Sequence, residues 1–211
     1  MDRLGDLRES ASQTAGPYVH IGCVPRFAGL DGMYGGADLG AEMITGPASG
    51  QRIAVSGRVF DGTGTALRDA MLEIWQADAA GLFPAPGETR GRADPHFTGW
   101  GRQATDGGDG GYRFDTIKPG QVPWRDGRLQ APHMLLWIVA RGINLGLLTR
   151  IYFEDEAAAN AGDPILTRLE HQNRIGTLLA RVDGARTNGE DNAYRFDIHL
   201  QGAQETVFFD V

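Results

Sequence analysis

The side chains that most often bind metals or act as nucleophiles are sparse in this 211-residue sequence. There is one cysteine, Cys23, and there are five histidines, which are His20, His96, His133, His171 and His199. No two histidines form a His-x-His or His-Glu-x-x-His pair, the spacings that place two imidazoles on one strand or helix face. We therefore expect no metal site and no catalytic centre on this chain alone, and we interpret Cys23 as a packed thiol.

Two short segments nevertheless have residue types suited to binding. Arg141 directly follows the apolar run 134–140, so its guanidinium is expected to emerge at a strand end. An arginine fork matches the geometry of a carboxylate, although a surface ion pair is the more ordinary interpretation. In residues 14–18 (TAGPY), Gly16 and Pro17 would let the backbone approach a ligand closely, and an ordinary turn is the alternative.

The elements that must position these residues are mostly strands. Alternating or continuous apolar patterns predict strands near residues 52–60, 70–78, 112–117, 134–140, 147–153, 194–201 and 205–211. The run 134–140 (MLLWIVA) is typical of a strand covered on both faces. Gly-rich clusters such as 106–111 supply the turns. One stretch, from Asp163 to Val182, favours a helix because its apolar residues recur at helical spacing.

This pattern indicates an all-β protein with an antiparallel β-sandwich core and one helix. Residues 1–50 are rich in Gly, Pro and Ala and lack periodicity, so we expect an extended N-terminal arm over 1–50 and a sandwich domain over 51–211. A long irregular arm is uncommon unless it has a function or docks on something.

Charge and composition exclude several classes of function. The net charge of −7 provides no basic surface for nucleic acid, and no apolar run approaches the ~20 residues that a membrane span needs. One cysteine excludes an internal disulfide and fits a reducing cytoplasm, where we expect the protein to reside. A small acidic ligand would need a local cation in so acidic a chain.

Several ordered sequence blocks resemble the intradiol ring-cleavage dioxygenases. They are residues 55–64 (VSGRVFDGTG), 70–78 (AMLEIWQAD), 116–120 (TIKPG), 123–125 (PWR), 131–133 (APH), 150–153 (RIYF) and 193–198 (AYRFDI). The resemblance extends over about residues 12–211. It implies a β-sandwich fold and, in the family, a non-haem Fe(III) held by two tyrosines and two histidines, which activates a catechol toward O₂.

The chain departs from the family at the expected ligand positions. The resemblance places the first tyrosine at about Thr89 and the second at Val122, and neither residue can supply a phenolate. His133 matches the first histidine, whereas Leu135 occupies the position of the second. Three of the four ligands are therefore missing.

Loss of these ligands resembles the iron-free alpha chain of the family members that are built from two chains. Residues 12–22 (SQTAGPYVHIG), 140–144 (ARGIN) and 201–210 (QGAQETVFFD) are the blocks most similar to that chain. The resemblance implies an iron-bearing beta partner in an alpha–beta hetero-oligomer, with 3,4-dihydroxybenzoate and O₂ as substrates. It also implies that the substrate pocket is lined by Thr14, Gly16, Pro17, Tyr18 and Arg141.

Two other interpretations remain open at this point. The chain could be a self-sufficient intradiol dioxygenase with unusual ligands such as Tyr112, His96 and His133. It could also be a non-enzymatic β-sandwich binding module, since turns like that in residues 57–64 occur in such modules. Iron analysis of the isolated chain separates the first of these from an iron-free subunit, and co-purification of an iron-bearing family chain argues against the second.

Overall fold

The computed structural model describes residues 13–144, 146–183 and 193–210. Residues 1–12 of the expected arm and Val211 of the expected last strand lie outside these ranges. Among the described residues, no helix is long and apolar enough to cross a bilayer.

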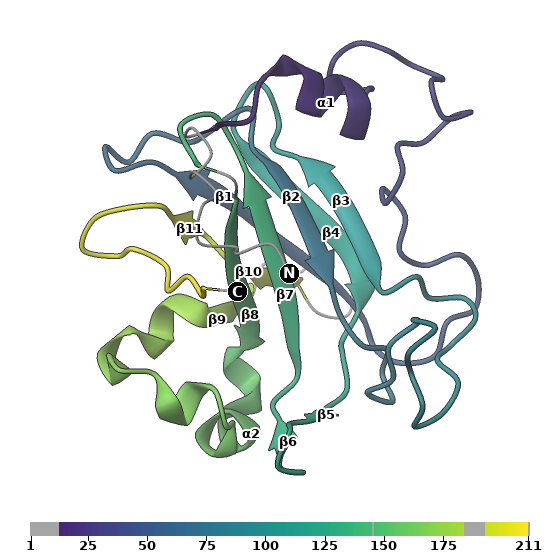
Figure 1. The fold of residues 1–211 in the computed structure, drawn as a ribbon, viewed down its shortest axis with the longest axis vertical. Helices are drawn as coiled ribbons and strands as arrows, with labels where there is room; N and C mark the ends of the chain where they lie inside the picture. Colours follow the sequence, from purple (N-terminus) through teal and green to yellow (C-terminus); the bar gives the residue numbers. More distant parts are fainter. Residues whose placement is uncertain (1–12, 145, 184–192, 211) are drawn as a thin grey trace, which may run out of the picture.

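The fold is mostly strand, as predicted (Figure 1). The strands are β1 (Arg52–Phe60), β2 (Met71–Trp75), β3 (Trp100–Ala104), β4 (Gly111–Ile117), β5 (Val122–Pro123), β6 (Leu129–Gln130), β7 (His133–Val139), β8 (Leu147–Phe153), β9 (Leu179–Asp183), β10 (Ala193–Arg195) and β11 (Ile198–His199). The helical segments are α1 (Pro17–Cys23), η2 (Glu154–Glu156), α2 (Ala157–Gly162), η3 (Leu166–Arg168) and η4 (Gln172–Leu178).

One nine-stranded sheet runs in the order β11-β1-β10-β9-β8-β7-β2-β3, with β4 paired to β1, and β5 and β6 form a separate pair. The large sheet folds over on itself, so that side chains of β1 and β4 such as Val55 and Phe114 share one core cluster with Leu72 of β2 and Leu136 of β7. This is the packing expected of a sandwich. Three pairings, β1 with β10, β1 with β11 and β8 with β9, are parallel, so the sheet is mixed rather than purely antiparallel.

The predicted helix over 163–182 is wrong. The segment forms the 3₁₀ turns η3 and η4 and then strand β9. The Asp163 carboxylate accepts from the backbone N–H groups of Ile165 and Leu166, as an N-cap does, so a helical turn starts there. The turn does not continue into a helix, and the Gln172 amide instead donates to the carbonyl oxygens of Leu166 and Leu169, which a helix would bond to backbone N–H groups. Some of the segment's apolar residues still bury, since Leu166 and Leu178 pack against Tyr152 in a second cluster, whereas Val182 is 47% exposed.

Other differences concern the ends of the chain and β7. Helix α1 forms where no regular element was expected, starting with Pro17 at its first turn, and α2 adds a second short helix. Residues 205–210 form only an isolated bridge, between Phe209 and Leu148, rather than a strand. Strand β7 is not covered on both faces, since Trp137 is 41% exposed. Tyr194, Phe196 and Ile198, which alternate with polar residues in the predicted strand 194–201, are buried.

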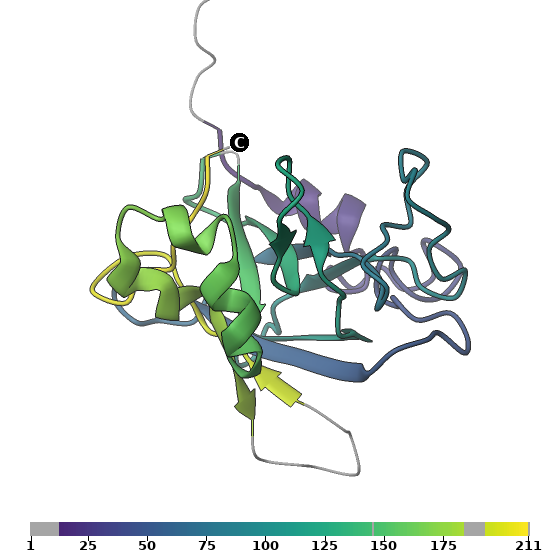
Figure 2. The ribbon, with the colours of Figure 1, turned by 90° about the horizontal axis from the view of Figure 1, so that it is seen from below.

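Helix α1 and helix α2 lie toward opposite ends of the molecule (Figure 1), and Figure 2 shows the short helices near α2 grouped beside one edge of the strands. Helix α1 is held at its end by a small cluster in which Ala15, Val19 and Cys23 pack against Met71 of β2 and Val139 of β7. The partly buried Cys23 is thus packed, as expected. This cluster brings the N-terminal segment to the end of β7, where Arg141 follows.

Candidate functional site

The N-terminal segment is fastened to the turn after β7 by hydrogen bonds. The Thr14 hydroxyl donates to the carbonyl of Ala140 (3.3 Å) and accepts from the N–H of Gly142 (2.8 Å). Residue 14 also forms an antiparallel bridge with Asn144, whose side-chain oxygen accepts from the N–H of Gln13 (2.9 Å). Gly142 has φ of +80°, a conformation that favours glycine. Two segments that the sequence singled out separately therefore meet.

Arg141 is positioned by the β2–β7 ladder. Met71 opposes Val139 at the end of this antiparallel pair, and continuing the register by two residues on each strand places Asp69 opposite Arg141. The Arg141 Nε indeed forms an ion pair with a carboxylate oxygen of Asp69. The Arg141 side chain is 77% exposed, so most of its guanidinium remains accessible to a ligand.

A mostly apolar hollow of about 510 Å³ lies between α1 and this ion pair. It is lined by Gly16, Pro17 and Arg141, three of the five residues predicted for the pocket, together with His20, Phe27 and Asp69. Thr14 acts at its edge by fixing the 140–142 turn. Tyr18 does not line the hollow, and its side chain is 85% exposed on the outer face of α1.

Sequence reasoning assigned no role to two residues of this hollow. His20 is 8% exposed, packs against Phe27 with ring centroids 4.8 Å apart, and has an Nε2 atom with no hydrogen-bond partner in the described part of the chain. Asp69 is the counter-ion of Arg141. The strand register would have revealed Asp69 once β2 and β7 were paired, because directly opposed residues of antiparallel strands contact each other. No sequence signal identified His20.

A second polar cluster surrounds His133, at the other end of β7. The His133 Nδ1 lies 2.8 Å from the carbonyl oxygen of Ala131, which fixes Nδ1 as the protonated nitrogen, and Nε2 accepts from Nη1 of Arg150 (3.1 Å). The same Nη1 donates to Gln130 Oε1 (2.8 Å) and lies 3.4 Å from the Tyr152 hydroxyl.

Burial dominates the acid–base behaviour of this cluster. Desolvation, aided by the Arg150 charge, lowers the pKa of His133 to about 4, so the imidazole is neutral near pH 7. Burial also raises the pKa of the Tyr152 phenol well above its usual value, although the Arg150 charge opposes this. Neither ring is available to a metal ion, because the imidazole lone pair already accepts from Arg150 and the Tyr152 phenol stays protonated.

The residues at the family's ligand positions do not fit a ferric ion. Val122 is buried in β5, Leu135 is apolar, and Thr89 is exposed, so His133 is the one matching donor among these four positions. Within the described ranges, no group of three or more His, Cys, Asp and Glu side chains is arranged to hold a metal. Ferric sites in this family need anionic phenolates, and none of these positions supplies one.

The alternative ligand Tyr112 has a different task. Its hydroxyl donates to the carbonyl of Phe196 (2.6 Å) inside the core, and burial raises the pKa of this phenol strongly. A residue larger than glycine at Gly57 would place its Cβ 1.8 Å from the same carbonyl oxygen. Tyr112 therefore joins β4 to the β10–β11 junction, and the structure gives no support to its use as a phenolate ligand.

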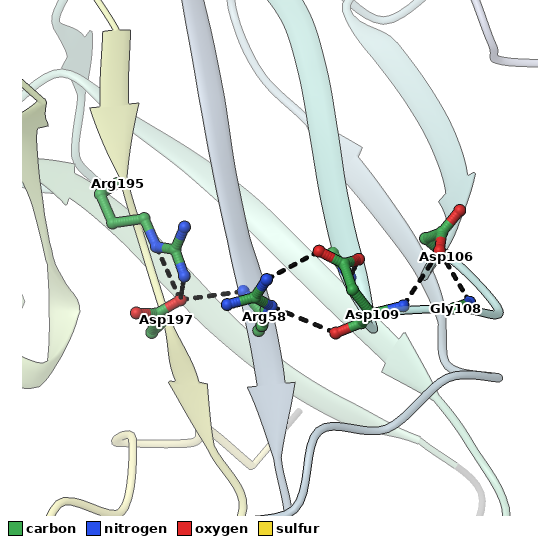
Figure 3. Close-up of polar contacts among 7 residues, drawn as sticks. Arg58, Asp106, Gly108, Asp109, Arg195 and Asp197 are labelled. Atoms are coloured by element: carbon green, nitrogen blue, oxygen red, sulfur yellow. Dashed lines mark hydrogen bonds and ion pairs between the residues drawn. The ribbon is translucent and has the colours of Figure 1, made fainter. Parts of the chain in front are cut away.

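A larger hollow of about 690 Å³ lies between the N-terminal arm and β1, β3 and β4, and charged groups at its edge form hydrogen bonds within the chain (Figure 3). Arg58 of β1 donates to the Asp109 carboxylate (2.7 Å), while Asp197 accepts from the backbone N–H of Arg58 and from Arg195 Nε, both at 2.9 Å. Asp106 accepts the N–H of Gly108 in the turn before β4 (2.7 Å). These contacts hold the turn and the β10–β11 junction against β1, which is a structural role.

Comparison with known proteins accords with this architecture. The family model described as Dioxygenase matches residues 35–202. The chain is 42% identical to the protocatechuate 3,4-dioxygenase alpha chain of Pseudomonas putida, over 97% of each chain, and 34% identical to the beta chain of Burkholderia cepacia, over 82% of this chain and 78% of that one. The dioxygenase domain of a Streptomyces sp. SirexAA-E fusion protein is 28% identical with a TM-score of 0.53, covering 76% of this chain and 86% of that one.

The chain thus belongs to the intradiol dioxygenase family. Within the family, it is similar over nearly its whole length to protocatechuate 3,4-dioxygenase alpha chains, and it matches the beta chain at lower identity and coverage.

Proposed function

We propose that this chain is the alpha, iron-free subunit of a protocatechuate 3,4-dioxygenase. It would form an alpha–beta hetero-oligomer with an iron-bearing beta chain and help cleave 3,4-dihydroxybenzoate, with both atoms of O₂, to 3-carboxy-cis,cis-muconate during aromatic degradation. The observation that carries the proposal is a full-length similarity to alpha chains combined with a ligand set that does not fit iron. A cytoplasmic location suits the single cysteine.

In this assembly the chain's task is to bind and orient the substrate. The ring chemistry is supplied by the Fe(III) expected on the partner. Arg141 provides a cation in a chain of net charge −7, so an anionic aromatic acid is attracted to the hollow rather than repelled. Gly16 and Pro17 give the hollow an apolar wall at the start of α1. Thr14 keeps this wall and the arginine in register. Tyr18 is exposed and does not line the hollow, so it would contribute to the pocket only where the partner chain completes it.

The N-terminal arm, residues 1–50, would also contact the partner. Exposed large apolar side chains concentrate on its described part: six of the nine such residues in the described ranges fall between 18 and 39, namely Tyr18, Phe27, Leu30, Met33, Tyr34 and Leu39. Such a concentration on a compact protein marks a contact surface more often than chance exposure. The sandwich domain, 51–211, then supplies the scaffold.

The test is to produce the chain alone and together with a cognate family chain that retains two tyrosines and a His-x-His. We expect the isolated chain to carry no stoichiometric iron and to be inactive, and the co-expressed pair to purify as one complex that consumes O₂ with 3,4-dihydroxybenzoate. An isolated chain with one iron, a tyrosinate-to-iron absorption band and catechol cleavage would overturn the proposal. So would a co-expressed pair that does not associate.

A further inference from the structure

Arg150 of β8 lies next to His133 of β7 on the same face of the sheet. In the β7–β8 ladder, His133 opposes Tyr152 and Leu135 opposes Arg150. Because alternate residues of paired strands share a face, these four side chains form one patch. The two β7 members of the patch, His133 and Leu135, are the positions at which the family resemblance expects the two histidine ligands.

The Arg150 guanidinium lies directly on the imidazole atom that would bind a metal. Nδ1 of His133 is engaged by the Ala131 carbonyl, so Nε2 carries the free lone pair, and Arg150 Nη1 donates to it at 3.1 Å. A guanidinium has donors only and remains charged at every accessible pH. The imidazole therefore already binds a cation, and the cation belongs to this chain.

Further hydrogen bonds hold Arg150 and His133 in this arrangement. Gln130 accepts from the same Nη1 at 2.8 Å, and in the β5–β6 ladder Gln130 opposes Val122, the position matched to a tyrosine ligand. The Asp163 carboxylate lies 3.4 Å from the Tyr152 hydroxyl and accepts the N–H of Ala131, which steadies the loop that orients His133. Arg150 also lies over the Phe209 ring, 5.9 Å from its centroid.

We infer that Arg150 closes this chain to metal: its guanidinium fills the place a metal ion would take against His133, so the site is blocked and not simply short of ligands. The inference goes beyond the proposed function, because it concerns metal binding by this chain alone. It depends on the chain's membership of the family and not on its assembly with a beta chain. The internal cation adds to the loss of ligands, so restoring the missing ligands would not by itself restore metal binding.

The experiment restores the missing ligands with and without the arginine. The full chain carries Thr89→Tyr, Val122→Tyr and Leu135→His, either alone or combined with Arg150→Gln, and is produced with ferric iron in excess. A third form combines the three substitutions with Arg141→Gln, which removes the same charge from an exposed position. Iron per chain and the tyrosinate-to-iron absorption band are measured on folded protein.

We expect at least 10-fold more iron in the Arg150→Gln form than in the other two. Equal iron in all three forms, or none in any, would refute the inference. If Val122→Tyr prevents folding, Arg150→Gln alone is titrated with Zn²⁺ to millimolar concentration while the ring ¹⁵N resonances of His133 are followed. These resonances should shift in Arg150→Gln and stay fixed in wild type and Arg141→Gln; identical behaviour of all three would again refute it.

Discussion

Arg141 and Arg150 lie at opposite ends of the β7–β8 region, and they differ in how their charge is used. Arg141 follows the end of β7, is largely exposed and pairs with one carboxylate, that of Asp69. Arg150 lies within β8, is partly buried, and donates to uncharged acceptors on Gln130 and His133. A cation that donates to buried acceptors stabilises the fold, whereas an exposed cation is available to a ligand. The Arg141 end of the sheet is suited to binding an anionic ligand, and the Arg150 end is suited to excluding a metal ion.

Replacing each arginine by methionine should separate these two roles most strongly. Arg150→Met leaves the buried acceptors Gln130 Oε1 and His133 Nε2 without a donor, so the free energy of unfolding should fall by about 4 kcal/mol. Arg141→Met removes only an exposed ion pair and should cost less than about 1 kcal/mol. Urea denaturation of the full chain measures both values. Similar losses in the two variants would show that the contrast in burial has no energetic meaning.

The pH dependence of stability sharpens the description of the buried end. Burial lowers the pKa of folded His133 to about 4, against about 6.5 in the unfolded chain, so the unfolded state binds more protons between these values. The contribution of His133 is therefore complete above about pH 6.5 and is lost as the pH falls toward 4, by about 3 kcal/mol in total. Wild type should lose that much more than His133→Gln when denaturation at pH 7 and pH 4 is compared. Parallel losses would contradict a neutral, buried imidazole.

Much of this fold is encoded in local sequence patterns. The predictions that failed concern segments whose structure depends on side-chain hydrogen bonds or packing that these patterns do not show. The strand pattern from residue 52 onward predicted the sheet because side-chain alternation survives in any sandwich. The prediction for 163–182 failed because the helical turn that Asp163 caps does not continue, and the Gln172 amide binds carbonyl groups that a helix would use, which apolar spacing does not reveal. Helix α1 was missed because its seven residues make only about two turns, too few to show a helical period. Its stability comes from packing on Met71 and Val139.

The site divides in the same way. Arg141 was predictable from a cation directly after an apolar strand, and Gly16 and Pro17 from their conformational properties. Asp69 requires the pairing of β2 with β7, and the contact between Arg150 and His133 requires the register of β7 with β8. Both contacts depend on strand pairing between separate segments, so the pattern of residues along the sequence does not reveal them. Tyr18 was grouped with the hollow by its motif, yet its side chain points away from it.

The exposed end is tested by kinetics in the alpha–beta complex. Arg141→Ala should lower kcat/KM for 3,4-dihydroxybenzoate by about 10-fold or more, which corresponds to roughly 1.4 kcal/mol, because the local cation for the substrate is lost. Catechol, which has no carboxylate, should be affected much less. Unchanged constants with 3,4-dihydroxybenzoate would remove Arg141 from the pocket, and equal losses with both substrates would make its role structural.

The smallest expected effect comes from the partner of that arginine. Asp69→Asn keeps an oxygen that accepts from Arg141 Nε, so the guanidinium stays oriented. The substitution removes the negative charge that competes with the substrate carboxylate for Arg141. Because the pair is exposed and screened, the gain is small: KM for 3,4-dihydroxybenzoate should fall about twofold at low salt, and the difference should shrink as ionic strength rises. Asp126→Asn, in the exposed ion pair with Arg128 (2.8 Å), is the matched control. A rise in KM for Asp69→Asn would mean that Asp69 acts through the geometry of the pair and not through its charge.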